Sequence, residues 1–156
     1  MLGEVLTAIA TPFGADGEVD VDRFRALARH LVENGSDGLA VTGSTGEGAT
    51  LNDDEKVLLW RTAVEEVGDR ATVIAGAGTY DTHHSVELAK RAAGAGVDGL
   101  LVVAPYYNKP PQRGIVAHLE AIASACSVRC TECAVAYVPV PAITVPRSPT
   151  VSTAAA

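Results

Sequence analysis

The chain has 156 residues, enough for one domain with a hydrophobic core, and its 47% apolar and 20% charged residues are ordinary for a globular protein. The formal net charge of -7 argues against a nucleic-acid or anionic-membrane partner. No apolar run approaches the roughly 18 residues of a membrane span, no secretory signal is visible, and three clustered cysteines do not suggest a disulfide framework. We therefore expect a cytoplasmic protein.

An apolar run, a polar loop and an amphipathic helical segment follow one another four times, with a period of about 30 residues. The first run is Val5–Ala10. The helix after it is expected to have Asp20 as its N-cap and to end at Gly35. The second run, Gly38–Thr42, opens directly into a glycine-rich loop, Gly43–Gly48.

The second helix is expected to begin with a capping box formed by Asn52 and Glu55. The third apolar run is Ala71–Ala75, and the fourth, Gly99–Ala104, leads into the loop 105–111. Short apolar runs that alternate with helices are typical of parallel strands buried on both faces. The α/β pattern therefore predicts either a doubly wound sheet or a (βα) barrel, and in both the functional residues lie in the loops after the strands.

The pattern breaks after Ser124. All three cysteines and four of the eight prolines lie beyond it. Prolines are excluded from helix interiors and central strands, so residues 139–156 are expected to be loop or disordered, and at most Ala134–Val138 to form a fifth strand. The chain divides into a regular part, 1–124, and a divergent, irregular tail, 125–156. A truncation or a shifted reading frame would explain this tail, and the other frames of the coding DNA are then expected to recover a strand with a lysine.

Two motifs in the chain resemble cofactor sites. Gly94–Gly99 spells the dinucleotide fingerprint G-x-G-x-x-G, yet it follows a helix and precedes a strand, so we interpret it as a plain helix-to-strand loop. Cys126, Cys130 and Cys133 have the spacing that holds a [4Fe–4S] cluster in radical enzymes that use S-adenosylmethionine. They follow the fourth helix instead of the first strand, so chance clustering is favoured over an Fe–S protein.

Three of the four histidines are considered as candidate metal ligands on expected helices. His83 and His84 begin the third helix, and His118 lies on the fourth. None has a carboxylate or cysteine at a familiar metal-ligand spacing, so we interpret them as solvated or partly packed. We expect neither a metal nor a cofactor.

Two loops after strands carry the candidate site residues. In Gly43–Gly48, glycines let the backbone approach a ligand, backbone N–H groups can hold a carboxylate or phosphate, and the hydroxyls of Ser44 and Thr45 add donors. A plain glycine-rich turn is the alternative. After the fourth run, Tyr106 and Tyr107 supply two phenols, of which one can relay protons while the other packs.

Taken together, four segments resemble the dihydrodipicolinate synthase family of pyruvate-dependent class I aldolases in both order and spacing: Leu6–Phe13, Gly43–Glu47 with Thr50-Leu51, Val73–Gly78 and Pro105–Pro110. The resemblance covers residues 3–124. It implies a partial (βα)8 TIM barrel of about four βα units. It also implies a lyase that condenses pyruvate with aspartate semialdehyde through a Schiff base in lysine (diaminopimelate) biosynthesis, and a homotetramer.

The same resemblance assigns roles to the loop residues. Thr45 would bind the pyruvate carboxylate, and Ser44 would stand where the family has a hydroxyl in its proton relay. Tyr107 would be the relay phenol that reaches across a dimer interface, with Tyr106 as a packing residue.

The chain departs from the family pattern in two places. Tyr137 is followed by Val138 where the family has Tyr-Asn, so the catalytic role is not assigned to it. The Schiff-base lysine has no counterpart, because the chain contains only Lys56, Lys90 and Lys109 and none follows a sixth strand. Without a covalent electron sink, this chain alone is expected to be inactive.

Other functions stay open at this point. The Ser44-Thr45 pair also resembles that of N-acetylneuraminate lyase, a sister family, so another pyruvate aldolase is an alternative. A half-barrel with two unpaired strand edges is also compatible with a non-catalytic binding or assembly module, and such edges predict self-association.

Overall fold

The structure, a computed structural model, describes residues 4–133 of the chain. In this part five parallel strands alternate with four helices, and strands that are neighbours in the chain are neighbours in the sheet. The elements are β1 Leu6–Ala8, α1 Val21–Glu33, β2 Gly38–Val41, α2 Asp53–Val67, β3 Thr72–Gly76, α3 Thr82–Gly94, β4 Gly99–Val103, α4 Gln112–Ser124 and β5 Arg129–Cys133.

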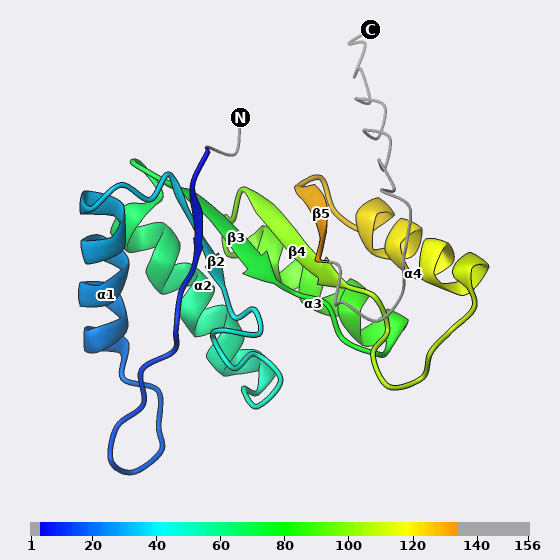
Figure 1. Cartoon of the computed structure of the whole chain (residues 1–156), viewed down its shortest axis with the longest axis horizontal. Coiled ribbons are helices and arrows are strands. Elements are labelled where there is room, and N and C mark those ends of the chain that lie inside the picture. The colour runs from blue at the N-terminus through cyan, green and yellow to red at the C-terminus, as the bar shows by residue number, and fades with distance from the viewer. Residues whose placement is uncertain (1–3, 134–156) are drawn as a thin grey trace, which may run out of the picture.

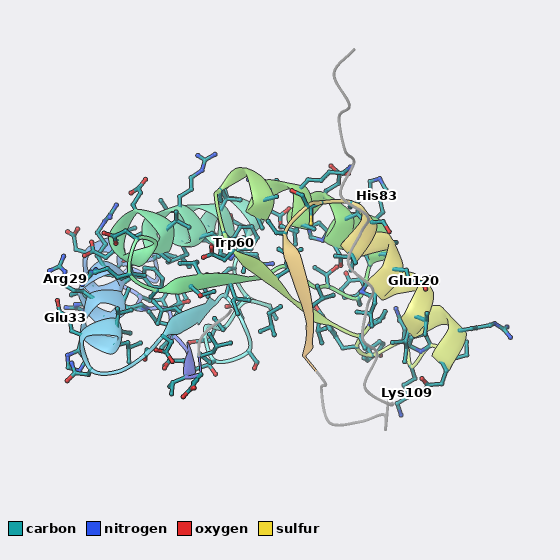
Figure 2. All side chains as sticks on the ribbon, turned by 90° about the horizontal axis from the view of Figure 1, so that it is seen from above. Arg29, Glu33, Trp60, His83, Lys109 and Glu120 are labelled. Carbon is teal, nitrogen blue, oxygen red and sulfur yellow. The ribbon has the colours of Figure 1, made fainter. Side chains whose placement is uncertain are left out.

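The helices form a layer around one face of the twisted sheet (Figures 1 and 2). A doubly wound sheet would reverse its strand order and carry helices on both faces, whereas a barrel wall adds each strand beside the last and keeps its helices outside. The consecutive parallel order β1-β2-β3-β4-β5 is that of a barrel wall. The predicted partial TIM barrel is therefore confirmed.

The hydrophobic core lies between the sheet and the helices. Along β2, Leu39 and Val41 are fully buried, whereas Ala40 between them is only partly buried. Successive strand residues face opposite sides of a sheet, so the first two face the helices and Ala40 faces the inner side. On the helix side they join the fully buried Phe24 of α1 and Trp60 of α2.

Helix ends lie where the sequence predicts them. The Asp20 carboxylate accepts a hydrogen bond from the Arg23 N–H at 3.0 Å, which caps α1. At the start of α2, the Asn52 side chain accepts from the Glu55 N–H at 2.9 Å, and the Glu55 carboxylate accepts from the Asn52 N–H at 2.7 Å. This reciprocal pair is the predicted capping box. Gly35 follows α1 with a φ of 101°, the left-handed conformation that favours glycine.

The segment Gly94–Gly99 runs from the end of α3 to the start of β4, as the helix-to-strand interpretation requires. The strand β5, in contrast, lies inside the segment that the sequence predicts to be irregular. It pairs with β4 along its whole length. Its sequence, Arg-Cys-Thr-Glu-Cys, contains no run of large apolar residues, which is why hydrophobic pattern alone missed it. The alternative strand Ala134–Val138, the segment 139–156 and Tyr137 lie outside the described residues.

Candidate active site

The glycine-rich loop leaves the carboxyl end of β2 and folds tightly back on itself. The Gly48 N–H donates to the Gly43 carbonyl at 3.0 Å, and the Glu47 N–H donates to the Ser44 carbonyl at 3.1 Å. A Cβ atom on Gly48 would lie 2.0 Å from the carbonyl oxygen of Thr42. The loop can therefore close in this way only with glycine at that position.

A second contact holds the loop from the side of β1. The buried hydroxyl of Thr11 donates to the Gly46 carbonyl at 2.7 Å. Gly46 is buried, and a Cβ atom there would lie 3.0 Å from the carbonyl oxygen of Ile9. The backbone of the loop is thus fixed by residues that closely follow β1 and β2.

Ser44 and Thr45 are adjacent exposed residues of this fixed loop, and Glu47 is exposed as well. Gly46 and Gly48, in contrast, are buried. The loop therefore presents two adjacent hydroxyls at the carboxyl end of the sheet, on a backbone that is fixed by the contacts of its buried residues. Hydroxyl and N–H groups on such a turn can bind an anion such as a carboxylate.

The loop after β4 carries the two tyrosines. Tyr107 has a φ of 71° and a side chain that is 95% exposed, so its phenol packs against little of this chain. Tyr106 instead packs edge-to-face on Tyr80, with ring centroids 5.5 Å apart and an angle of 85° between the planes. The structure thus brings Ser44 and Thr45 together on one loop, but it does not bring the Tyr107 phenol against them.

The five described strands contain no lysine. Lys56 lies on α2, only 8% exposed, and burial lowers its pKa while the nearby Asp53 carboxylate opposes this. Lys90 on α3 forms an ion pair with Glu87 at 2.7 Å. Lys109 lies in the loop before α4 (Figure 2). None of the three is placed on one of the described strands.

The histidines have separate roles in packing. His84 on α3 contacts Asp53 at the start of α2 through Nε2, at 2.9 Å. His118 on α4 is 2% exposed, which is deeper than the solvated or partly packed state expected for it. Its Nδ1 lies 2.8 Å from the Thr82 hydroxyl, so it links α4 to the start of α3.

The described residues include no group of three or more His, Cys, Asp or Glu side chains that could hold a metal. Cys126 is partly buried, and burial raises the pKa of its thiol, which disfavours the thiolate that metals bind. The side chains of Cys130 and Cys133 lie outside the part that the structure describes, so the cluster motif stays a sequence-based alternative.

The burial of His118 gives a pH prediction. Burial is the main cause that lowers its pKa, while the Val103 backbone and, to a smaller extent, the Asp81 carboxylate act in the opposite direction. The unfolded chain, with a histidine pKa of about 6.5, then takes up a proton that the folded chain does not. Stability is expected to fall as pH falls below about 6.5.

Denaturant unfolding at several pH values between about 7 and 5 measures this effect, above the range where most carboxylates titrate. In the variant His118→Asn, the free energy of unfolding is expected to change less with pH than in the parent between about pH 7 and 5, whatever the absolute stability of the variant. Equal slopes for the two proteins would contradict the prediction.

Comparison with known proteins adds to this geometry. A sequence profile of the dihydrodipicolinate synthetase family matches residues 1–131. The chain belongs to this family. It is 62% identical over 124 residues to the 4-hydroxy-tetrahydrodipicolinate synthase of Mycolicibacterium paratuberculosis, a match that covers 80% of this chain and 41% of the relative.

Solved structures of the family share the fold. The dihydrodipicolinate synthase of Bacillus anthracis matches with a TM-score of 0.83 and 42% identity, and the match covers 85% of this chain and 45% of that one. The enzyme of Acinetobacter baumannii complexed with pyruvate matches with a TM-score of 0.82 and 34% identity, with the same coverage of both chains. This chain therefore spans less than half the length of the family members that it resembles.

The described part of the chain contains no helix with the length and apolarity that a membrane span requires. The family match ends at residue 131, within β5, so the family-like region includes at least the start of that strand. The predicted division at Ser124 and the shifted reading frame stay predictions.

Proposed function

We propose that this chain is the N-terminal part of a cytoplasmic lyase that condenses pyruvate with aspartate semialdehyde in lysine biosynthesis. The observation that carries the proposal is the exposed Ser44-Thr45 pair on a loop that is fixed at the carboxyl end of β2. Family membership supports the reaction class. The relative from Acinetobacter baumannii, solved with pyruvate, supports the substrate.

In this proposal the loop binds the pyruvate carboxylate. The Thr45 hydroxyl and the backbone N–H groups of the loop donate to its oxygens, and the fixed backbone needs no rearrangement on binding. The Ser44 hydroxyl passes a proton between an atom bonded to the reacting carbonyl carbon and a phenol. Tyr107, whose side chain is 95% exposed in one chain, would act on a second subunit.

The covalent step needs an amine that this chain does not place at the strand ends. A lysine amine would attack the pyruvate keto carbon, and the adduct would lose water to form the Schiff base. The Schiff base would then accept the electron pair of a methyl C–H bond as its proton leaves to a base, and the resulting enamine carbon would attack the aldehyde carbon. Lys56, Lys90 and Lys109 all lie on helices or a loop. We therefore infer that the chain alone binds pyruvate weakly and does not turn it over.

Backbone NMR of the 15N-labelled chain during pyruvate titration tests the binding proposal. The amide signals of Ser44 and Thr45 are expected to shift, with sodium chloride at equal ionic strength as the control. The variant Thr45→Val, which keeps the shape and removes the hydroxyl, is expected to bind about ten- to a hundredfold more weakly, since a hydrogen bond to a charged group is worth about 1.5–3 kcal/mol. Thr45→Ser should restore binding. Equal affinity of Thr45→Val and parent, or shifts confined to other regions, would overturn the proposal.

A further inference from the structure

The residue that joins β2 to the glycine-rich loop Gly43–Gly48, called the carboxylate-binding loop from here on, has an unusual backbone conformation. Thr42 has a φ of 58°, in the left-handed region that a β-branched residue rarely adopts. It is 4% exposed. Such a conformation persists only where the surrounding structure holds it, and it commonly marks a functional constraint. The neighbours that hold Thr42 therefore set the direction in which the loop leaves the strand.

One of these neighbours is Trp60 of α2. Its indole Nε1–H donates to the Thr42 hydroxyl oxygen at 2.8 Å, in a fully buried contact. Trp60 has no exposed surface, and Figure 2 shows it between α2 and the sheet. A buried indole N–H that loses its acceptor is costly, so this hydrogen bond fixes the side chain of Thr42 as well as its own ring.

The Thr42 hydroxyl also contacts backbone carbonyl groups of β2 and β3. Its single proton can be donated to the Val41 carbonyl at 2.7 Å or to the Gly76 carbonyl at 3.2 Å. Gly76 ends β3, and a Cβ atom there would lie 2.4 Å from the Thr42 carbonyl oxygen. Trp60, Thr42 and Gly76 thus connect α2, the end of β2 and the end of β3 directly beneath the loop.

We propose that Trp60 is a positioning residue for the carboxylate-binding loop, and that it acts through its hydrogen bond to Thr42. The bond holds Thr42 in its left-handed conformation, which directs Gly43 away from the sheet and leaves Ser44 and Thr45 exposed. The inference rests on the proposed function of these two residues. It goes beyond that function by assigning the geometry of the loop to one buried side chain on the helix side of the sheet.

Amide hydrogen exchange at Glu47 and Gly48 provides the test, because both N–H groups are hydrogen-bonded only when the loop is closed. Trp60→Phe keeps an aromatic ring and removes the hydrogen-bond donor. It is expected to accelerate exchange of these amides about tenfold, because the closed loop loses the stabilisation of one buried hydrogen bond. Phe24→Leu is the matched control. It shrinks another fully buried aromatic side chain of the same core, on α1, and should leave the loop amides at the parent rate.

Two variants of Thr42 separate the hydrogen bond from packing. Thr42→Ser keeps the hydroxyl and should behave as the parent, whereas Thr42→Val should accelerate exchange as Trp60→Phe does. The double variant Trp60→Phe/Thr42→Val should exchange these amides little faster than either single variant, because both changes remove the same hydrogen bond. In the parent, Trp60 is the only tryptophan, so its indole N–H signal should move in Thr42→Val and stay in Thr42→Ser.

Parent-like exchange in Trp60→Phe, or equal acceleration in Phe24→Leu, would overturn the proposal. Pyruvate titration of the same proteins should show weaker binding in Trp60→Phe and unchanged binding in Phe24→Leu. If pyruvate binds to none of the proteins, the proposed function fails, but the exchange rates still decide the positioning role.

Discussion

Incubated with pyruvate and sodium borohydride, this chain is expected to keep its unmodified mass. Borohydride reduces a Schiff base to a stable adduct, so intact mass spectrometry counts the amines that react. Burial lowers the pKa of Lys56, which favours its neutral, nucleophilic amine. It lies on α2, on the helix side of the sheet, and is only 8% exposed, so pyruvate held at the strand ends cannot reach it.

The synthase of Mycolicibacterium paratuberculosis, treated in parallel, provides the positive control and should gain the adduct mass. A stoichiometric adduct on Lys56, Lys90 or Lys109 of this chain would contradict the prediction. Peptide mapping of the reduced protein identifies the residue. The variant Lys56→Arg keeps the charge and removes the amine's reactivity, so it distinguishes a specific adduct from slow modification of exposed lysines.

Substitution of Gly76 by alanine is expected to lower the free energy of unfolding by about 3 kcal/mol, the upper part of the range for overpacking. The added methyl group would lie 2.4 Å from the carbonyl oxygen of Thr42 and 2.9 Å from the nitrogen of Gly43. Both are backbone atoms, so no side-chain rotation relieves the contact. Because the strands β2 and β3 must separate, the loop that carries Ser44 and Thr45 should also shift.

Gly94→Ala is the matched control, because a Cβ atom at this last residue of α3 meets nothing within 4 Å. It should leave stability equal to that of the parent or raise it by up to about 1 kcal/mol, since alanine restricts the unfolded chain and favours the helix. Denaturant unfolding of the three proteins measures both changes. Equal midpoints for Gly76→Ala and Gly94→Ala would show that β2 and β3 are not in close contact.

Much of the fold could be predicted from the sequence because it depends on local signals. The capping residues Asp20 and Asn52 and the apolar runs of β2, β3 and β4 are patterns within a few residues of one another. The strand β5 could not be predicted in this way. Its polar residues become a strand because the chain leaves α4 beside the free edge of β4, which is a property of the assembled sheet.

The candidate site was predictable to a different extent. The pair Ser44-Thr45 could be found because it follows a strand in a glycine-rich loop. The supporting contact between Trp60 and Thr42 joins residues 18 positions apart, and nothing in their types indicates a hydrogen bond. The burial of His118 was missed for the same reason, since its partner Thr82 lies on another helix. Tyr107 is 95% exposed among the described residues, so its phenol offered no local packing for a sequence pattern to predict.

A chimera tests the central claim that residues 1–124 form a competent half of the family's active site. These residues are joined to the part of the Mycolicibacterium paratuberculosis synthase that follows its matched 124 residues. With pyruvate and borohydride, the chimera is expected to gain the adduct mass that the chain alone does not. It should also consume pyruvate when aspartate semialdehyde is added, and Thr45→Val in the chimera should lose most of that activity. A chimera that unfolds cooperatively yet forms no adduct, or that is unaffected by Thr45→Val, would contradict the account.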